Sequence, residues 1–175
     1  MVTRAGVTPT GSARSLPGFK APGVGFEQPF AMLEACHERV QRTLGLLERL
    51  CTHVRDKGAD DAARQAARDV LRYFDIAAPL HHEDEELHVF PALLSGPDKA
   101  LHALVARLIQ NHRDMEVAWG QARRVLLAIA DSPESGWTPL TLEQTAALTA
   151  FAALYRQHLE DEDNVAYPAA QAVLS

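Results

Sequence analysis

The sequence predicts an all-α protein, an antiparallel up-down four-helix bundle with a flexible N-terminal tail. Apolar residues recur at three- and four-residue spacing along most of the chain, and no stretch alternates as a strand would. Short breaks rich in glycine, proline and serine separate four helical stretches, which is typical of antiparallel neighbours. A chain of 175 residues is long enough for one domain with a full core.

Each helix has a recognisable beginning or end. The first is expected to begin at Pro29, because proline suits the first helical turn, and to end at Asp56-Lys57-Gly58. Thr141 and Gln144 have the spacing of a capping box and are expected to open the last helix. The four helices are therefore expected at about 29–55, 60–94, 98–130 and 141–173.

Residues 1–26 differ from the remainder of the chain. They hold three prolines, five glycines and no acidic residue, so we expect a flexible segment, with a partner-binding arm as the alternative. Residues 27–175 are expected to form the bundle.

Composition excludes several classes of function. A net charge of −6 argues against a general binder of nucleic acid or anionic membranes. No apolar run approaches the length of a membrane span, and no apolar leader segment is present. Cys36 and Cys51 fall in one predicted helix, about 22 Å apart at its rise per residue, so they are expected to be unpaired. These features favour a cytoplasmic protein.

The chain contains an internal repeat. Residues 81–92 read HHEDEELHVFPA and residues 158–169 read HLEDEDNVAYPA, with six of the twelve positions identical. A similar offset relates His37 to His112. The chain is thus two copies of one helix pair, each with a lone histidine followed by His-x-x-x-Glu.

The repeat predicts a metal centre inside the bundle. Residues four apart share a helix face, and the helix lengths place all four histidines within about two turns of one level. Two histidine pairs bridged by two carboxylates suit two iron ions. Glu116 lies four residues after His112 and is a candidate seventh ligand, whereas its repeat equivalent is Gln41. One metal would then keep an open position for O2, peroxide or NO. The predicted ligands are His37, His81, Glu85, His112, Glu116, His158 and Glu162.

The remaining histidines are expected to lie elsewhere. His82 diverges from His81 by one helical position, or 100°, and is expected not to be a ligand. His88 is expected in a supporting or surface role, and His53 and His102 on the surface. Tyr155, three residues before His158, is expected to pack in the core or to donate a hydrogen bond at the site.

This pattern resembles the hemerythrin-like (HHE cation-binding) family. The resemblance covers about residues 27–173 and implies a non-haem di-iron centre, oxo- or hydroxo-bridged, in a four-helix bundle. It makes Asp163 a rival to Glu162 as the second bridge, because oxygen-carrying members place that carboxylate five residues after the histidine. It implies a protein that binds O2, NO or peroxide in stress response or iron handling. The alternatives are iron-centre repair, a di-iron peroxidase or NO-consuming enzyme, and a structural bundle with another metal.

Overall fold

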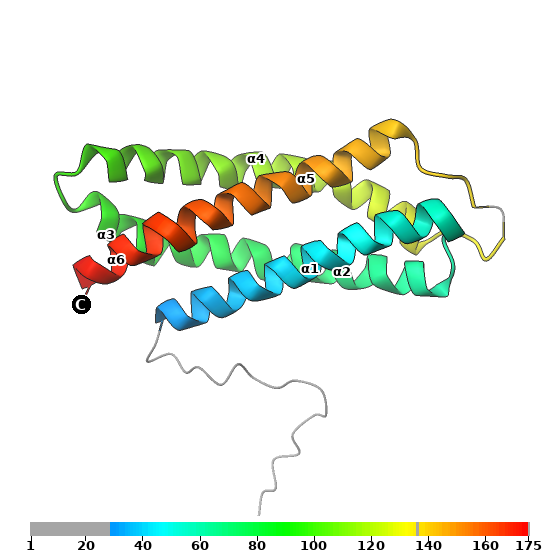
Figure 1. Ribbon diagram of the computed structural model, residues 1–175, viewed down its shortest axis with the longest axis horizontal. Helices are drawn as coiled ribbons and strands as arrows, with labels where there is room; N and C mark the ends of the chain where they lie inside the picture. Colours follow the sequence, from blue (N-terminus) through cyan, green and yellow to red (C-terminus); the bar gives the residue numbers. More distant parts are fainter. Residues whose placement is uncertain (1–28, 136, 175) are drawn as a thin grey trace, which may run out of the picture.

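The structure is a bundle of four antiparallel arms, which confirms the predicted fold class (Figure 1). This computed structural model describes residues 29–135 and 137–174, so the predicted flexible segment 1–26 lies outside the described residues. The first and third arms are single helices, α1 (Pro29–Lys57) and α4 (Lys99–Ala130). The second arm consists of α2 (Asp61–Asp84), a π-helical segment η1 (Glu85–Val89) and α3 (Phe90–Leu94). The fourth repeats this order with α5 (Leu142–Asp161), η2 (Glu162–Ala166) and α6 (Tyr167–Leu174).

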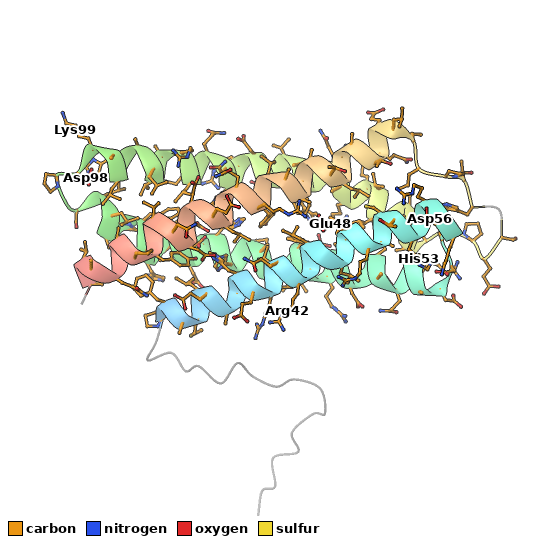
Figure 2. The ribbon with its side chains drawn as sticks, viewed as in Figure 1. Arg42, Glu48, His53, Asp56, Asp98 and Lys99 are labelled. Atoms are coloured by element: carbon orange, nitrogen blue, oxygen red, sulfur yellow. The ribbon has the colours of Figure 1, made fainter. Side chains whose placement is uncertain are left out.

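Local chemistry fixes the helix ends. α1 ends at Lys57, and the next residue, Gly58, has a φ of 81°, the left-handed conformation that glycine adopts without strain. The side chains of Asp60 and Asp98 cap α2 and α4 by accepting hydrogen bonds from backbone N–H groups of the first turn. Figure 2 labels Asp98 at the start of α4. Thr141 and Gln144 form the predicted capping box at the start of α5, with bonds of 3.1 and 2.9 Å.

The two π segments interrupt helices that were predicted to be continuous. The N–H of Phe90 bonds to the carbonyl of Glu85, five residues back, and the N–H of Tyr167 does the same to Glu162. In each arm a proline follows directly, and proline can neither donate to the carbonyl four residues back nor fit against it. Just after the π segments, the ring of Phe90 stacks on that of His112 and the ring of Tyr167 stacks on that of His37.

The apolar core is divided into two clusters with a polar layer between them. One cluster, which includes Val40, Phe74 and Met115, fills the half of the bundle nearer the α1–α2 turn. The other, which includes Leu33 and Leu108, fills the opposite half. No helix among the described residues is both long and apolar enough to cross a membrane. Both cysteines are unpaired, as expected.

Candidate metal centre

The polar layer is made of residues that the repeat singled out. Four histidines and two glutamates, from all four arms, meet between the two apolar clusters. Both glutamates are 0% exposed, and no histidine of this group exceeds 8%. Ionisable residues are rarely buried this completely unless they are paired or bind a metal. The six are His37, His81, Glu85, His112, His158 and Glu162.

The histidines form two pairs. The Nε2 atoms of His37 and His81 are 3.0 Å apart, and those of His112 and His158 are 3.1 Å apart. Two nitrogens bound at a right angle to one metal, each at roughly 2.1 Å, would be about 3.0 Å apart. Each pair is thus spaced as two ligands of one ion, and we call the two pairs the His37–His81 half and the His112–His158 half.

Glu85 lies between these halves. Its Oε1 is 3.2 Å from Nε2 of His81, and its Oε2 is 3.4 Å from Nε2 of His112. One carboxylate oxygen therefore faces each half, which is the arrangement of a bridging ligand.

Glu162 repeats this arrangement from the fourth arm. Its Oε2 is 3.3 Å from Nε2 of His37, and its Oε1 is 3.0 Å from Nε2 of His158. Two groups of four ligand atoms result, each within a span of 4.8 Å and both containing the two glutamates.

Unpaired buried oxygens test whether metal ions fit these groups. Among the described residues, Oε2 of Glu85 and both carboxylate oxygens of Glu162 accept no hydrogen bond of acceptable geometry, although histidine nitrogens lie 3.0 to 3.4 Å away. Burying a carboxylate without a donor or a cation is costly, and water does not reach these atoms. Two cations between the carboxylates and the histidine pairs would remove that cost, so the donor set fits two metal ions.

Two further carboxylates orient histidines from behind. Nδ1 of His37 is 2.7 Å from Oδ1 of Asp163, and Nδ1 of His112 is 2.8 Å from Oε1 of Glu86. Asp163 and Glu86 occupy equivalent positions of the repeat. A carboxylate on Nδ1 fixes the ring so that Nε2 faces the centre. Asp163, the rival bridge, therefore lies behind His37, and Glu162 supplies the oxygens that face both halves.

The metal-free centre holds protons tightly. Burial opposes the charged form of His37, but the carboxylates of Glu162 and Glu85 outweigh it and raise its pKa to about 10. Burial likewise opposes the charge on His81, whose pKa contacts with Cys36 and Glu85 raise to about 9. These protons occupy the nitrogens that would bind a metal, so metal binding must displace them.

Comparison with known proteins agrees with this geometry. The model of the hemerythrin HHE cation-binding domain matches residues 28–170, which is most of the chain. The chain belongs to the hemerythrin HHE cation-binding family. An uncharacterized protein of Haemophilus influenzae is 41% identical over 69 residues. That match covers 39% of this chain and 40% of the relative, so the chain spans well under two thirds of the relative's length.

Sequence reasoning missed Tyr167 as a member of this hemerythrin-family centre. Its hydroxyl donates to Oε1 of Glu85 and lies 2.9 Å from Nε2 of His37. Burial and the nearby carboxylates raise its pKa far above the usual value, so the phenol stays protonated in the metal-free protein. The repeat does single out this position, because an aromatic residue precedes the proline in both copies, Phe90 in the first and Tyr167 in the second.

His82 also lies closer to the centre than predicted. The His82 side chain does point away from His81, but it points toward the His112–His158 half. One of its ring nitrogens lies within 4.8 Å of ring nitrogens of His112 and His158. Its ring stacks on that of His112, with centroids 4.0 Å apart. Burial and nearby His112 lower its pKa to about 2, so this ring is neutral. The 100° between neighbouring residues means that His81 and His82 do not share a face of the helix. It does not prevent both rings from lying beside the same centre.

The other predicted positions lie outside the layer. Glu116, the candidate seventh ligand, is exposed on α4, and its carboxylate belongs to neither group of converging atoms. His88 is exposed on η1, and His102 bonds to the carbonyl of Gly96. His53 lies near the end of α1 (Figure 2) and pairs with Asp60. Tyr155 is buried and stacks at 5.9 Å on the ring of His82.

Proposed function

We propose that the chain is a non-haem di-iron protein that binds O2, NO or peroxide as part of stress response or iron handling. One observation carries the proposal: two groups of four buried ligand atoms overlap in the same two glutamates. Histidine and carboxylate donors suit iron, and carboxylate bridges between helices of a bundle suit a pair of ions. Iron bound there would supply redox chemistry and a place for a diatomic ligand or peroxide.

The residues of this chain would divide the work. His37 and His81 would hold one ion, His112 and His158 the other, and Glu85 and Glu162 both. Asp163 and Glu86 would keep the α1 and α4 histidines oriented, because each accepts from the ring nitrogen that faces away from the centre. The apolar clusters on either side would exclude bulk water from the layer.

Anaerobic reconstitution tests the proposal. We expect about two irons per chain after addition of ferrous iron, and near-UV absorption once the protein is oxidised. Spectra are then recorded with O2, NO and peroxide in turn, and zinc and manganese are loaded in parallel. The double variant His81→Ala, His158→Ala should lose the iron. Less than one iron per chain in the unmodified protein, or unchanged loading in the double variant, would contradict the proposal.

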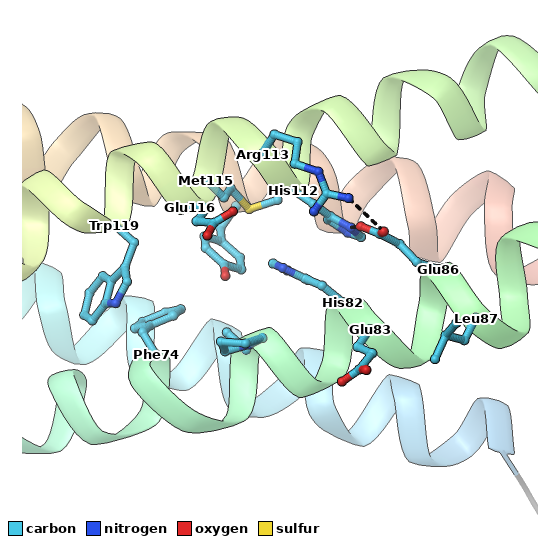
Figure 3. A pocket seen from close by; sticks show the side chains of 13 residues that line it. Phe74, His82, Glu83, Glu86, Leu87, His112, Arg113, Met115, Glu116 and Trp119 are labelled. Atoms are coloured by element: carbon cyan, nitrogen blue, oxygen red, sulfur yellow. Dashed lines mark hydrogen bonds and ion pairs between the residues drawn. The ribbon is translucent and has the colours of Figure 1, made fainter.

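Turnover is a second candidate, because a pocket lined by His82 and His112 lies beside the centre (Figure 3). A peroxidase or NO-consuming enzyme would use peroxide or NO continuously with a reductant present. Steady-state consumption by the iron-loaded protein supports this candidate, whereas one stoichiometric reaction per centre supports binding alone.

A further inference from the structure

A pocket of about 400 Å³ lies between α2 and α4, beside the centre (Figure 3). Pockets of this volume hold small organic molecules, and a diatomic ligand or peroxide fills only a small part of one. Much of the wall is apolar and comes from aromatic rings together with Ala78, Pro79, Leu87 and Met115. The pocket therefore has room for a larger molecule than those considered so far.

Three aromatic side chains form one part of this wall. The ring of Phe74 lies 5.3 Å from that of Trp119 and 5.2 Å from that of Tyr155, measured between centroids, and all three line the pocket. The indole N–H of Trp119 donates to Asp75 at 2.9 Å, which holds the ring in place. Aromatic rings bind apolar groups, and their faces also attract organic cations.

The side chains that line the pocket carry more negative than positive charge. Three are carboxylates, those of Glu83, Glu86 and Glu116, and Arg113 is the arginine among them. Arg113 pairs with Glu86 at 3.0 Å, so its charge is balanced within the pocket. The carboxylates of Glu83 and Glu116 have neither an ion pair nor a hydrogen bond among the described residues. The pocket therefore suits a cation better than an anion.

His82 and Glu116 point toward one another across the pocket, His82 from α2 and Glu116 from α4 (Figure 3). The His82 ring stacks on those of His112, at 4.0 Å, and Tyr155, at 5.9 Å, which hold it in place. No hydrogen bond to either nitrogen of this ring is found in the part of the chain that the structure describes, although the side chain is partly buried. A carboxylate and an imidazole nitrogen placed in this way can both accept hydrogen bonds from one ammonium group.

We propose that this pocket binds a small organic ammonium ion with an apolar or aromatic body. The ammonium N–H groups donate to the carboxylate of Glu116 and to a ring nitrogen of His82. The body of the molecule packs against the rings of Phe74, Trp119 and Tyr155. This site goes beyond the proposed binding of O2, NO or peroxide, because none of its contacts needs a metal and an ammonium group has no lone pair with which to bind one.

Isothermal titration calorimetry with benzylammonium at neutral pH tests the inference, in metal-free and in iron-loaded protein. Benzyl alcohol is the uncharged comparison and benzoate the anionic one. We expect benzylammonium to bind about tenfold more tightly than benzyl alcohol, the effect of one charged hydrogen bond, and benzoate to bind more weakly than either. Glu116→Gln should remove most of the preference for the cation. Glu83→Gln removes the same charge from another carboxylate of the pocket and should keep most of that preference.

His82→Leu should weaken the binding of benzylammonium several-fold, whereas His88→Leu, at an exposed position of η1, should not. Circular dichroism confirms that each variant is folded. The inference is overturned if benzylammonium binds no more tightly than benzyl alcohol, or if Glu116→Gln and His82→Leu bind it as the wild type does. Binding to the iron-loaded protein alone also overturns it, because the free amine would then be bound to the metal. A protein that binds benzylammonium but takes up no iron overturns the proposed function and supports this inference, so the two failures are distinguishable.

Discussion

The two repeats, residues 29–94 and 99–174, place the same chemistry in different surroundings. Each contributes a histidine from its first helix and a His-x-x-x-Glu from its second, and each second helix changes to a π segment at the glutamate. Even the supporting carboxylates match, since Glu86 and Asp163 are equivalent. What differs is the layer around the ligands: His82 against Leu159, and Phe90 against Tyr167. The geometry of the predicted ligands is thus alike in both copies, whereas the side chains next to them differ.

Removing a predicted ligand that faces both halves should have the largest effect on iron content, because both ions would lose a ligand. Glu85→Ala and Glu162→Ala should each reduce bound iron from about two per chain to nearly none, since each carboxylate faces both halves. Glu83→Ala and Glu160→Ala are matched controls from the same acidic runs, and both residues are exposed. Metal analysis after reconstitution gives the answer. Retention of one iron in a bridge variant would show that the carboxylate serves a single half.

Removing a ligand from one half should separate the halves. His81→Ala and His158→Ala should each lower the iron content from about two to about one per chain, because neither residue lies in the other half's group. His88→Ala, at an exposed position of η1, should retain full loading. Loss of both irons in either single variant would mean that the halves fill only together.

Weakening the supporting carboxylates should affect both halves to a similar, smaller extent. Asp163→Asn and Glu86→Gln should each lower the iron affinity by about 10- to 100-fold, because the histidine in front loses its fixed orientation. Competition with a chelator measures the dissociation constants. Glu86 also pairs with Arg113 at 3.0 Å, so Arg113→Gln is the control for that contact. An unchanged affinity in both carboxylate variants would remove their assigned role.

The pH dependence should reverse between the metal-free and loaded protein. The pKa of His37 is about 10 in the folded metal-free protein, against an ordinary value of 6.5 for histidine. Its proton therefore stabilises the fold fully below pH 6.5, and that contribution is lost as the pH rises toward 10. We expect the Tm of the metal-free protein to fall by a few degrees from pH 7 to pH 9, while iron affinity rises over the same range.

Thermal unfolding followed by circular dichroism measures this effect in the stripped protein. His37→Gln, which has no such proton, should show a smaller fall in Tm. A Tm that rises from pH 7 to pH 9 would contradict the tight binding of protons in the first half.

Helix caps should give the smallest effect and leave the centre intact. Asp60 caps α2 and Thr141 caps α5, at the equivalent ends of the two repeats. Asp60→Ala and Thr141→Ala should each cost about 1 kcal/mol of unfolding free energy, measured by urea denaturation. Both variants should load iron as the wild type does. A change in iron content would mean that the stability of the distant helix ends affects metal binding at the centre.

Much of this molecule was predictable from sequence because its signals are local or repeated. Apolar spacing, Pro29 and the Thr141–Gln144 box predicted the arms and their ends, and the repeat singled out the six converging residues. The π segments were not predicted, because Pro91 and Pro168 are compatible with several helix interruptions. The places of His82 and Tyr167 depend on contacts between arms, which spacing within one helix does not contain. The role of Glu116 as a ligand stays a prediction.

The π segments make the number of residues between ligand and proline as important as their identity. Each residue of an α-helix turns the chain by 100°, so deletion of one residue within 86–89 or 163–166 would rotate everything beyond it by that angle. Phe90 or Tyr167 would then leave the face that covers the centre. Tolerance to substitution at exposed positions of these segments, such as His88 and Val165, should therefore coexist with intolerance to insertions and deletions. A change in length there would displace the aromatic rings of Phe90 or Tyr167 from the centre, although every predicted ligand would remain in the sequence.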